Sequence, residues 1–452
     1  MTAVQTDTPP RARDAAPPAF TGELDTDAAL LAAYVAEEER RLAGSPPRPE
    51  RTPAQQELTD EVFARCRTVR DAFLRLHTDG VYARLTGNLT RRPRLGDLVY
   101  EAAGHFPGLV PDRARMAAEL RFIQAEKDGL EIDQAAFCAA LLRSETAGRH
   151  LIDTMLMPTP RAQELLDGFR ATGRADLGSV LVERRGTAGH VTFRNAHCLN
   201  AEDNRLIADL ETAIDLVLLD EEIRVGVLRG GTVDHPRYAG RRVFSAGINL
   251  KDLRNGAISF VDFLLGRELG YINKMLRGLL TAPDAPAWCR RTVQKPWIGA
   301  VDTFAIGGGM QLLLVLDRVL LASDAYVSLP AAEEGIVPGL GNLRLPLQTG
   351  SRLARQVILG GRRIAATEPE ARLVCDEVVP AEELTEAVER SVRELSAPAV
   401  AANRQMLTLV EEPVDLYRGY LAEFALVQAA RSYSEDVLAK VERRWQRSRA
   451  RG

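Results

Sequence analysis

Hydrophobic side chains recur at helical spacing in the first part of the chain. Gaps of three, four or seven residues are typical of one face of an amphipathic helix, and they separate Leu58, Val62, Val69, Phe73 and Leu76. The pattern predicts an all-α N-terminal domain over residues 22–175. Residues 1–21 are rich in Pro, Ala and charge. Such a segment buries too little apolar surface to offset the entropy of ordering, so we expect a disordered tail.

Near residue 178 the pattern changes to short β-rich runs separated by turns or by helical segments such as 202–219. Strands are predicted in SVLVERR, HVTFRN, VGVLRG, RRVFSAG, WIGAVD, RVLLAS and AYVSLP. Strand, helix and strand in succession predict right-handed crossovers in a largely parallel sheet. We therefore expect an α/β core over 176–385, followed by a C-terminal helical region over 386–452.

Charge and cysteine usage narrow the possible functions. The formal charge of −4 comes from 58 basic and 62 acidic residues without a long block of one sign, which argues against nucleic acid as a partner. No stretch approaches the ~20 apolar residues of a membrane span. The five cysteines are far apart and form no CxxC pair. This pattern is typical of a protein in a reducing compartment. We expect a cytoplasmic protein without a membrane partner.

Two glycine-containing segments could carry chemistry: FSAGINLKDL (244–253) and KPWIGAVDTFAIGGGMQLLLVLDRVLLAS (295–323). In the first, small residues would leave the N–H of Ile248 accessible to a ligand. In the second, a strand runs into Gly307–Gly309 before a helix expected to begin near Met310. Unpaired N–H groups and the dipole of a helix N-terminus favour a negative oxygen, which is the requirement for an oxyanion hole. Both glycine clusters could instead be structural turns.

The segments RNAHCLNAED, FSAGINLKDL, 295–323 and GIVPGLGNLRL occur in an order that resembles the crotonase (enoyl-CoA hydratase/isomerase) superfamily over about 178–445. The resemblance implies a core of repeated ββα units that binds an acyl-CoA thioester. It also implies that the N–H groups of Ile248 and Gly308 stabilise the enolate oxygen. The residues expected to line the path of the substrate are Ala246, Gly247, Asn249, Gly307 and Gly309.

Departures from this superfamily narrow the expected reaction. Gln311 and Ala331 occupy the positions of the two hydratase glutamates, and neither can act as a carboxylate acid or base. Glu333 or Glu334 could substitute for them. Glu202 stands where the superfamily has an apolar residue. Glu202 could hydrogen-bond a hydroxylated acyl group together with Arg267. Alternatively, Glu202 could be a solvated residue at the start of a helix, and Arg267 could form a surface salt bridge.

Gln311, Glu202, Arg267 and the helical N-terminal half together resemble the cofactor-independent (3,5-dihydroxyphenyl)acetyl-CoA 1,2-dioxygenases of glycopeptide-antibiotic biosynthesis. That resemblance implies an arylacetyl-CoA and dioxygen as substrates, with no metal and no flavin. Leu312 and Val337 would contribute to a dry pocket for the apolar dioxygen. The six histidines show no HxxxH spacing. Two alternatives remain: a hydratase, isomerase or thioester hydrolase that uses Glu333 or Glu334, and a non-catalytic acyl-CoA-binding scaffold.

The phosphates of CoA need cations near the mouth of the pocket. Candidates in the core are Arg194, Arg237 and Lys251, and the basic run with Arg443, Arg444 and Arg447 could serve from a neighbouring subunit. Each could equally be a solvated charge. The resemblance implies a homo-oligomer, a trimer or a hexamer.

Overall fold

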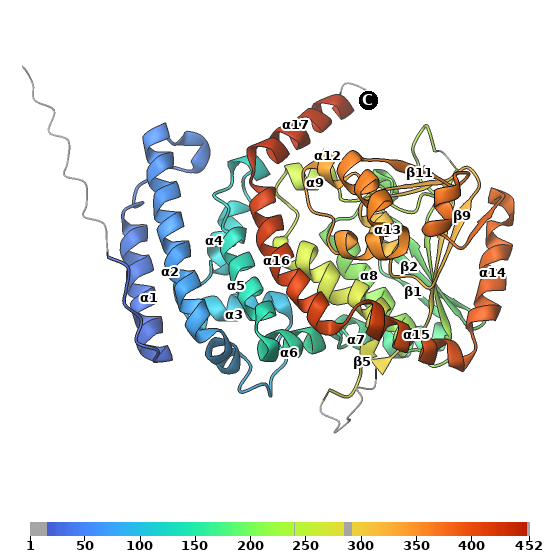
Figure 1. Cartoon of the computed structure of the whole chain (residues 1–452), viewed down its shortest axis with the longest axis horizontal. Coiled ribbons are helices and arrows are strands. Elements are labelled where there is room, and N and C mark those ends of the chain that lie inside the picture. Colours follow the sequence, from blue (N-terminus) through green and yellow to red (C-terminus); the bar gives the residue numbers. More distant parts are fainter. Residues whose placement is uncertain (1–15, 239, 284–291, 450–452) are drawn as a thin grey trace, which may run out of the picture.

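The computed structural model describes residues 16–238, 240–283 and 292–449 (Figure 1). Residues 1–15 of the expected tail lie outside the described residues, as do the side chains of Arg444 and Arg447. Residues 16–23 form no helix or strand, yet Phe20 packs edge-on against Phe73. In the described part of the chain, no helix has the length and apolar character needed to cross a membrane.

The N-terminal part is helical, as predicted. Its helices are α1 (Leu24–Arg40), α2 (Pro53–Leu85), α3 (Leu95–His105), α4 (Arg113–Glu119), α5 (Glu131–Arg143), α6 (Glu145–Met155) and α7 (Pro160–Thr172). Helix α2 begins at a capping box in which Thr52 and Gln55 satisfy each other's backbone N–H groups. Its buried face includes Val62, Val69 and Phe73. The predicted stripe is wrong at Leu76, which is 59% exposed, because the neighbouring helices do not cover that edge of α2.

The second part contains a seven-stranded sheet in the order β1-β2-β3-β4-β7-β9-β12. Its strands are β1 (Arg174–Asp176), β2 (Val180–Arg185), β3 (Ala188–Phe193), β4 (Val225–Gly230), β7 (Trp297–Val301), β9 (Arg318–Ala322) and β12 (Glu377–Val379). The pairs from β3 through β12 are parallel, and β1 to β3 pair antiparallel. The predicted α/β class with a largely parallel sheet is confirmed.

Two smaller sheets complete the strands. Their members are β8 (Phe304–Ile306), β10 (Tyr326–Ser328) and β11 (Arg363–Ala365) in one, and β5 (Leu279–Leu280) and β6 (Thr292–Val293) in the other. The strand predicted over 241–247 is wrong, because this segment makes only isolated bridges at Arg242 and Ser245. Its backbone approaches the end of β4 closely: a Cβ on Gly230 would lie 1.7 Å from the carbonyl oxygen of Val243.

The helices of the second part cover the sheet and close the molecule. They are α8 (Asn204–Leu219), α9 (Leu250–Arg254), α10 (Asn273–Arg277), α11 (Gly308–Leu313), α12 (Ala331–Glu334), α13 (Gly341–Gly360), α14 (Leu384–Leu395), α15 (Pro398–Glu411), α16 (Val414–Ser432) and α17 (Glu435–Arg449). Two π-helical turns, η4 (Phe260–Leu265) and η5 (Glu268–Ile272), precede α10. The short 3-10 helices are η1 (Arg48–Glu50), η2 (Gln124–Glu126), η3 (Ala196–Cys198), η6 (Pro369–Leu373) and η7 (Ala381–Glu383).

The C-terminal helix α16 returns to the N-terminal part and packs against α5 (Figure 1). Tyr417, Leu421 and Phe424 of α16 belong to the same hydrophobic core as the buried residues of α2 and α5. The two π-helical turns contribute Phe260 and Leu269 to that core. The helical half is therefore joined to the glycine-rich edge of the α/β core through α16 and the π-helical segment.

Candidate active site

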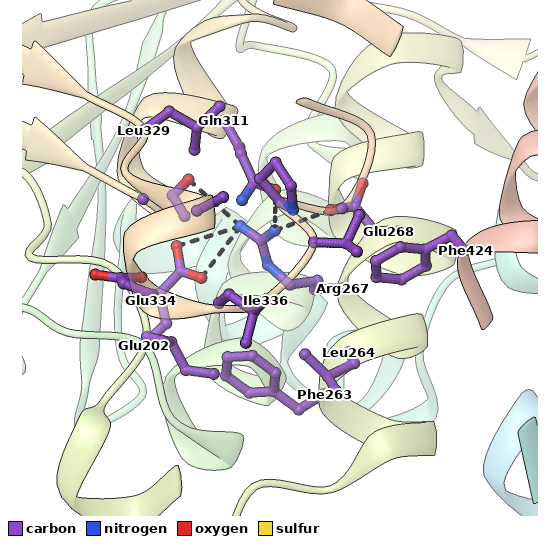
Figure 2. Close-up of a pocket in the computed structure, with 17 residues that line it drawn as sticks. Glu202, Phe263, Leu264, Arg267, Glu268, Gln311, Leu329, Glu334, Ile336 and Phe424 are labelled. Carbon is purple, nitrogen blue, oxygen red and sulfur yellow. Dashed lines mark hydrogen bonds and ion pairs between the residues drawn. The ribbon is translucent and has the colours of Figure 1, made fainter. Parts of the chain in front are cut away.

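A small cavity lies where the two glycine segments, the π-helical turns and α16 meet (Figure 2). Its free volume is about 40 Å³, enough for a few water molecules. The lining residues are Glu202, Ile248, Phe263, Leu264, Arg267, Glu268, Gly307, Gly308, Gln311, Leu329, Ala331, Glu334, Ile336, Val337, Pro338, Gly339 and Phe424. One side is thus apolar and the opposite side carries charge, which suits a ligand with one polar end.

The two glycine segments face each other at this cavity. A Cβ on Gly247, whose φ is +87°, would lie 3.6 Å from the amide nitrogen of Gly308. A Cβ on Gly307 would lie 3.4 Å from the Cα of Gly247. These distances allow ordinary contact, but the φ values of Gly247 and Gly307, +87° and +55°, are ones that residues with a side chain rarely adopt. Glycine therefore permits this backbone conformation.

Within the described residues, the backbone N–H groups of Ile248 and Gly308 have no hydrogen-bond acceptor. The neighbouring groups are paired: Glu202 N–H donates to the Gly247 carbonyl over 2.7 Å, and Asn249 N–H donates to the Glu202 carbonyl over 2.8 Å. Helix α11 begins at Gly308. The prediction of a start near Met310 is wrong, because the glycines themselves adopt the first helical turn. The Gly308 N–H is therefore at the positive end of α11.

Glu202 is buried beside this turn, at 2% exposure. It precedes Asp203, which caps α8 by accepting from the N–H of Leu206 over 2.8 Å. A Cβ on Gly308 would lie 2.4 Å from Oε2 of Glu202, so the carboxylate rests directly on that glycine. The solvated helix-start alternative for Glu202 is therefore excluded.

Arg267 lies between the two π-helical turns and is 4% exposed. Its Nη2 lies 3.1 Å from Oε2 of Glu202, and its Nη1 donates to Gln311 and to Glu268 over 2.9 Å each (Figure 2). Wide π-helical turns are frequent at functional sites, and here they flank a residue that contacts Glu202 and, in the second glycine segment, Gly308 and Gln311. Arg267 is part of a buried cluster, so the surface salt bridge alternative is also excluded.

A second layer of charges, which sequence spacing did not reveal, lies behind Arg267. Arg344 of α13 donates to Glu268 over 3.4 Å and to Glu412, at the end of α15, over 2.7 Å. Glu412 also accepts from Arg277 over 2.9 Å. The only sequence signal for this second layer was the acid–base pair of Arg267 and Glu268 inside the apolar run LLGRELGYI. The charged partners in the second layer are more than 60 residues away from one another in sequence.

Burial and the neighbouring charges together set the protonation of this cluster. Burial raises the pKa of Glu202 even though Arg267 opposes the shift. Burial disfavours the charged form of Arg267, but Glu202, Tyr271 and Glu268 outweigh this effect and raise its pKa. Burial also raises the pKa of Tyr271. The guanidinium therefore stays charged while the Glu202 carboxyl can gain a proton more readily than an exposed one.

The structure brings together most of the predicted site residues around the cavity. Ile248, Gly307, Gly308, Gln311 and Val337 line it. The prediction for Leu312 is wrong, because this side chain is in the main hydrophobic core of the α/β part, one position around α11 from Gln311.

The remaining predicted residues surround the cavity without lining it. Gly309 packs against Ser245, where a Cβ would meet the serine Cβ at 2.8 Å. Asn249 caps α9 by accepting from the N–H groups of Lys251 and Asp252, and Ala246 N–H donates to the Leu199 carbonyl over 3.2 Å. Glu334 lines the cavity, whereas Glu333 is exposed and lies against Gly361.

The candidate phosphate-binding residues lie outside the cavity. Arg194 pairs with Asp176 over 2.6 Å, Arg237 lies over the ring of Tyr238, and Lys251 is an exposed residue of α9. Arg443 is exposed on α17. No group of three or more His, Cys, Asp and Glu in the described ranges is placed to hold a metal ion.

Comparison with known proteins places this site in a family. Residues 183–420 match the enoyl-CoA hydratase/isomerase family. A crystal structure of an enoyl-CoA hydratase/isomerase from Pseudoalteromonas atlantica T6c is 21% identical, covers 60% of this chain and 97% of its own, and has a TM-score of 0.48. A probable enoyl-CoA hydratase from Rhizobium meliloti (strain 1021) is 30% identical over 243 residues, 52% of this chain and 84% of that protein.

A (3,5-dihydroxyphenyl)acetyl-CoA 1,2-dioxygenase from Amycolatopsis orientalis is 54% identical over 400 residues, which cover 88% of this chain and 92% of that enzyme. This match extends beyond the α/β core into the helical N-terminal half. The chain therefore belongs to the enoyl-CoA hydratase/isomerase family, the crotonase superfamily.

Proposed function

We propose that this chain is a dioxygenase that converts (3,5-dihydroxyphenyl)acetyl-CoA and dioxygen into 3,5-dihydroxyphenylglyoxylate and CoA, a step of dihydroxyphenylglycine and glycopeptide-antibiotic biosynthesis. The observation that carries the proposal is the 54% identity over 88% of the chain to an enzyme named for this substrate and reaction. The hydratase relative matches only 52% of the chain. The dioxygenase relative is thus similar in the helical half as well as in the core.

The N–H groups of Ile248 and Gly308 are the proposed oxyanion donors. Their freedom from intramolecular acceptors within the described residues supports this role, as does the start of α11 at Gly308. Loss of one donor of this kind typically costs about 3 kcal/mol of transition-state stabilisation. Two donors would therefore make the removal of a Cα proton from the thioester feasible.

Glu202, Arg267 and Gln311 are the proposed contacts of the ring hydroxyls. All three are buried and line the same cavity. An ionised Glu202 would accept from one hydroxyl, while Arg267 and Gln311 would donate to the oxygen of the other. Ala246, Gly247 and Asn249 would flank the thiol arm of CoA, and Gly307 and Gly309 would keep the second glycine segment close to it.

The proposed reaction balances without a further oxidant. Loss of the Cα proton gives an enolate that delocalises into the electron-rich ring, and this carbanion reduces dioxygen to a peroxide bonded to Cα. The peroxide attacks the thioester carbonyl and CoA leaves as the thiolate. Loss of the second Cα proton, with cleavage of the O–O bond, then leaves the α-keto acid. Both atoms of dioxygen enter the product. We propose that neither metal nor flavin takes part, because the carbanion itself supplies the electrons.

Exposed cations and apolar surfaces support proposals on CoA and assembly. Arg194, Arg237, Lys251 and Arg443 are the proposed partners of the CoA phosphates.

Helix α15 exposes four apolar side chains, each by 59% or more: Met406, Leu407, Leu409 and Val410. Apolar patches of this kind mark interaction sites, which supports a homo-oligomer, a trimer or a hexamer. The four described cysteines are free thiols, consistent with the proposed cytoplasmic location.

Turnover under labelled dioxygen tests the proposal. Metal-stripped protein and (3,5-dihydroxyphenyl)acetyl-CoA should consume one dioxygen per CoA released, and mass spectrometry should find two labelled atoms in the keto acid. CoA release without dioxygen would instead indicate a hydrolase, for which Glu334 at the cavity is the available base. Binding of the thioester without any product under air would indicate a scaffold. Strict dependence on added iron or flavin would refute the cofactor-free mechanism.

A further inference from the structure

A line of alternating buried charges runs from the cavity into the molecule. Glu202 pairs with Arg267, Arg267 with Glu268, Glu268 with Arg344, and Arg344 with Glu412. Each of these five residues is at most 5% exposed. Breaking a buried pair leaves an uncompensated charge and typically costs 3–5 kcal/mol, so the members of the line constrain one another.

Glu268 holds the central place in this line. Its Oε1 accepts from Nη1 of Arg267 over 2.9 Å, and its Oε2 accepts from Nη1 of Arg344 over 3.4 Å. Its backbone is fixed as well, since the hydroxyl of Tyr417 donates to the Glu268 carbonyl over 2.7 Å. Arg267 is a long side chain, and its planar fork takes the direction that its acceptors impose. Without the carboxylate of Glu268, only Gln311 would hold Nη1.

We propose that Glu268, held by Arg344, is a positioning residue: it aims Arg267 at the ring hydroxyls and sets the charge that Glu202 carries. This inference rests on the proposed function and deepens it, because it assigns a role to residues behind the cavity. Glu268 acts on the substrate through Arg267 and Glu202.

The charges around Glu202 give the direction of the electrostatic effect. The facing groups are Arg267, which stabilises the carboxylate, and Glu268 and Asp203, which raise its pKa. Tyr271 lies beside Arg267, and Glu334 lines the same cavity as Glu202. Neutralising Glu268 removes one repelling charge, so the pKa of Glu202 falls. Because the ionised form of Glu202 accepts from a hydroxyl, the acidic limb of the kcat profile then moves to lower pH.

Glu268→Gln and Glu412→Gln form a matched pair of variants. Both remove a buried negative charge next to Arg344, but only Glu268 touches Arg267. Glu268→Gln should lower kcat on (3,5-dihydroxyphenyl)acetyl-CoA by up to about 100-fold, change KM far less, and shift the acidic limb to lower pH. Glu412→Gln should lower stability without that shift. Arg344→Lys keeps the charge but loses the planar fork, so it should lower kcat with little shift of the limb.

Exchange of the Cα protons in anaerobic D₂O provides a readout that dioxygen does not affect. Glu268→Gln should slow exchange of (3,5-dihydroxyphenyl)acetyl-CoA and leave exchange of phenylacetyl-CoA within about three-fold of wild type, because the latter lacks the hydroxyls. Equal losses on both thioesters, or equal effects of Glu268→Gln and Glu412→Gln on the pH profile, would overturn the inference. Wild-type protein that exchanges Cα protons but never consumes dioxygen would refute the proposed function instead.

Discussion

Gln311 accepts a hydrogen bond from Nη1 of Arg267 over 2.9 Å, at the position where hydratases of this family carry a glutamate. The same guanidinium already serves the carboxylates of Glu202 and Glu268. The amide oxygen of Gln311 accepts a further hydrogen bond from this guanidinium without adding a third negative charge to the buried site. Glutamine at position 311 is thus compatible with the two carboxylates that Arg267 already contacts.

Gln311→Glu should therefore damage the site rather than create a hydratase. The new carboxyl would lie among two others with one arginine between them, so its pKa should rise and the free energy of unfolding should fall by about 1–3 kcal/mol at neutral pH. Turnover of (3,5-dihydroxyphenyl)acetyl-CoA should fall about ten-fold or more. Steady-state kinetics and thermal unfolding measure both effects. Gln311→Leu is the uncharged control, and a Glu variant as active as wild type would contradict the charge argument.

Gly339 offers a test of the loop that covers the polar side of the cavity. Its φ is +46°, and a Cβ there would lie 2.2 Å from Oε1 of Glu268 and 2.8 Å from Oε1 of Gln311. Gly339→Ala should displace both acceptors of the Arg267 Nη1 and lower kcat at least ten-fold, as expected for a shift of about 1 Å in a catalytic site.

Gly186→Ala is the matched control for that variant. Gly186 has a φ of +58° with no atom within 4 Å of an added Cβ, so the substitution measures backbone strain alone, about 1 kcal/mol. Thermal unfolding and kcat, measured for Gly339→Ala and Gly186→Ala, separate the effect of backbone strain from the effect of displacing Glu268 and Gln311. If the two variants lose activity equally, contact with Glu268 and Gln311 is not the cause.

Local patterns allowed much of the fold to be predicted from the sequence. Strands such as β2, β4 and β9 are short apolar runs bounded by turns, and their crossovers follow from chain order. The segment 241–247 was also predicted as a strand but makes only isolated bridges, where its backbone approaches Gly230 closely. That approach depends on tertiary contacts, which no local pattern encodes.

The site was predictable only in part for the same reason. The resemblance placed Ile248, Gly308 and Gln311 at the cavity, and the structure brings them together. Arg344 and Glu412 were not predicted, because their charged partners are far away in sequence and are brought together only by folding. Leu312 was misplaced since a one-residue step around α11 turns a side chain by about 100°, from the cavity into the core.

Glu412 predicts a pH dependence of stability. Burial alone would raise the pKa of this carboxyl, but Arg344 and Arg277 outweigh burial and hold the pKa below its ordinary value of 4.5. A lowered pKa in the folded state contributes stability above the unfolded pKa, and this contribution is lost as the pH falls through the folded pKa. Glu412→Gln should therefore cost about 3 kcal/mol at pH ~7, and the difference from wild type should shrink below pH ~4.

Urea unfolding of wild type and Glu412→Gln across that pH range measures the effect. The midpoint and slope must both be compared, because a change in slope would indicate an altered denatured state. A difference in unfolding free energy that does not shrink when the pH is lowered from ~7 to well below ~4 would show that the loss comes from packing and not from the charge of Glu412.

Phe424 of α16 closes the apolar side of the cavity, although it is far in sequence from the other lining residues. It is 4% exposed and belongs to the helical core. Phe424→Ala should lower the free energy of unfolding by about 3–5 kcal/mol and admit water beside the thioester. Water would hydrolyse the thioester and release CoA without dioxygen, so the dioxygen consumed per CoA released should fall below one.

Leu421→Ala on the same helix is the control for Phe424→Ala. Leu421 is fully buried in the same core but does not line the cavity, so its loss should lower stability and leave the ratio at one. An oxygen electrode combined with a thiol assay gives the ratio directly. Destabilisation alone should not change the dioxygen consumed per CoA released. An equal value of this ratio in both variants would therefore mean that Phe424 supports the fold without excluding water from the reaction.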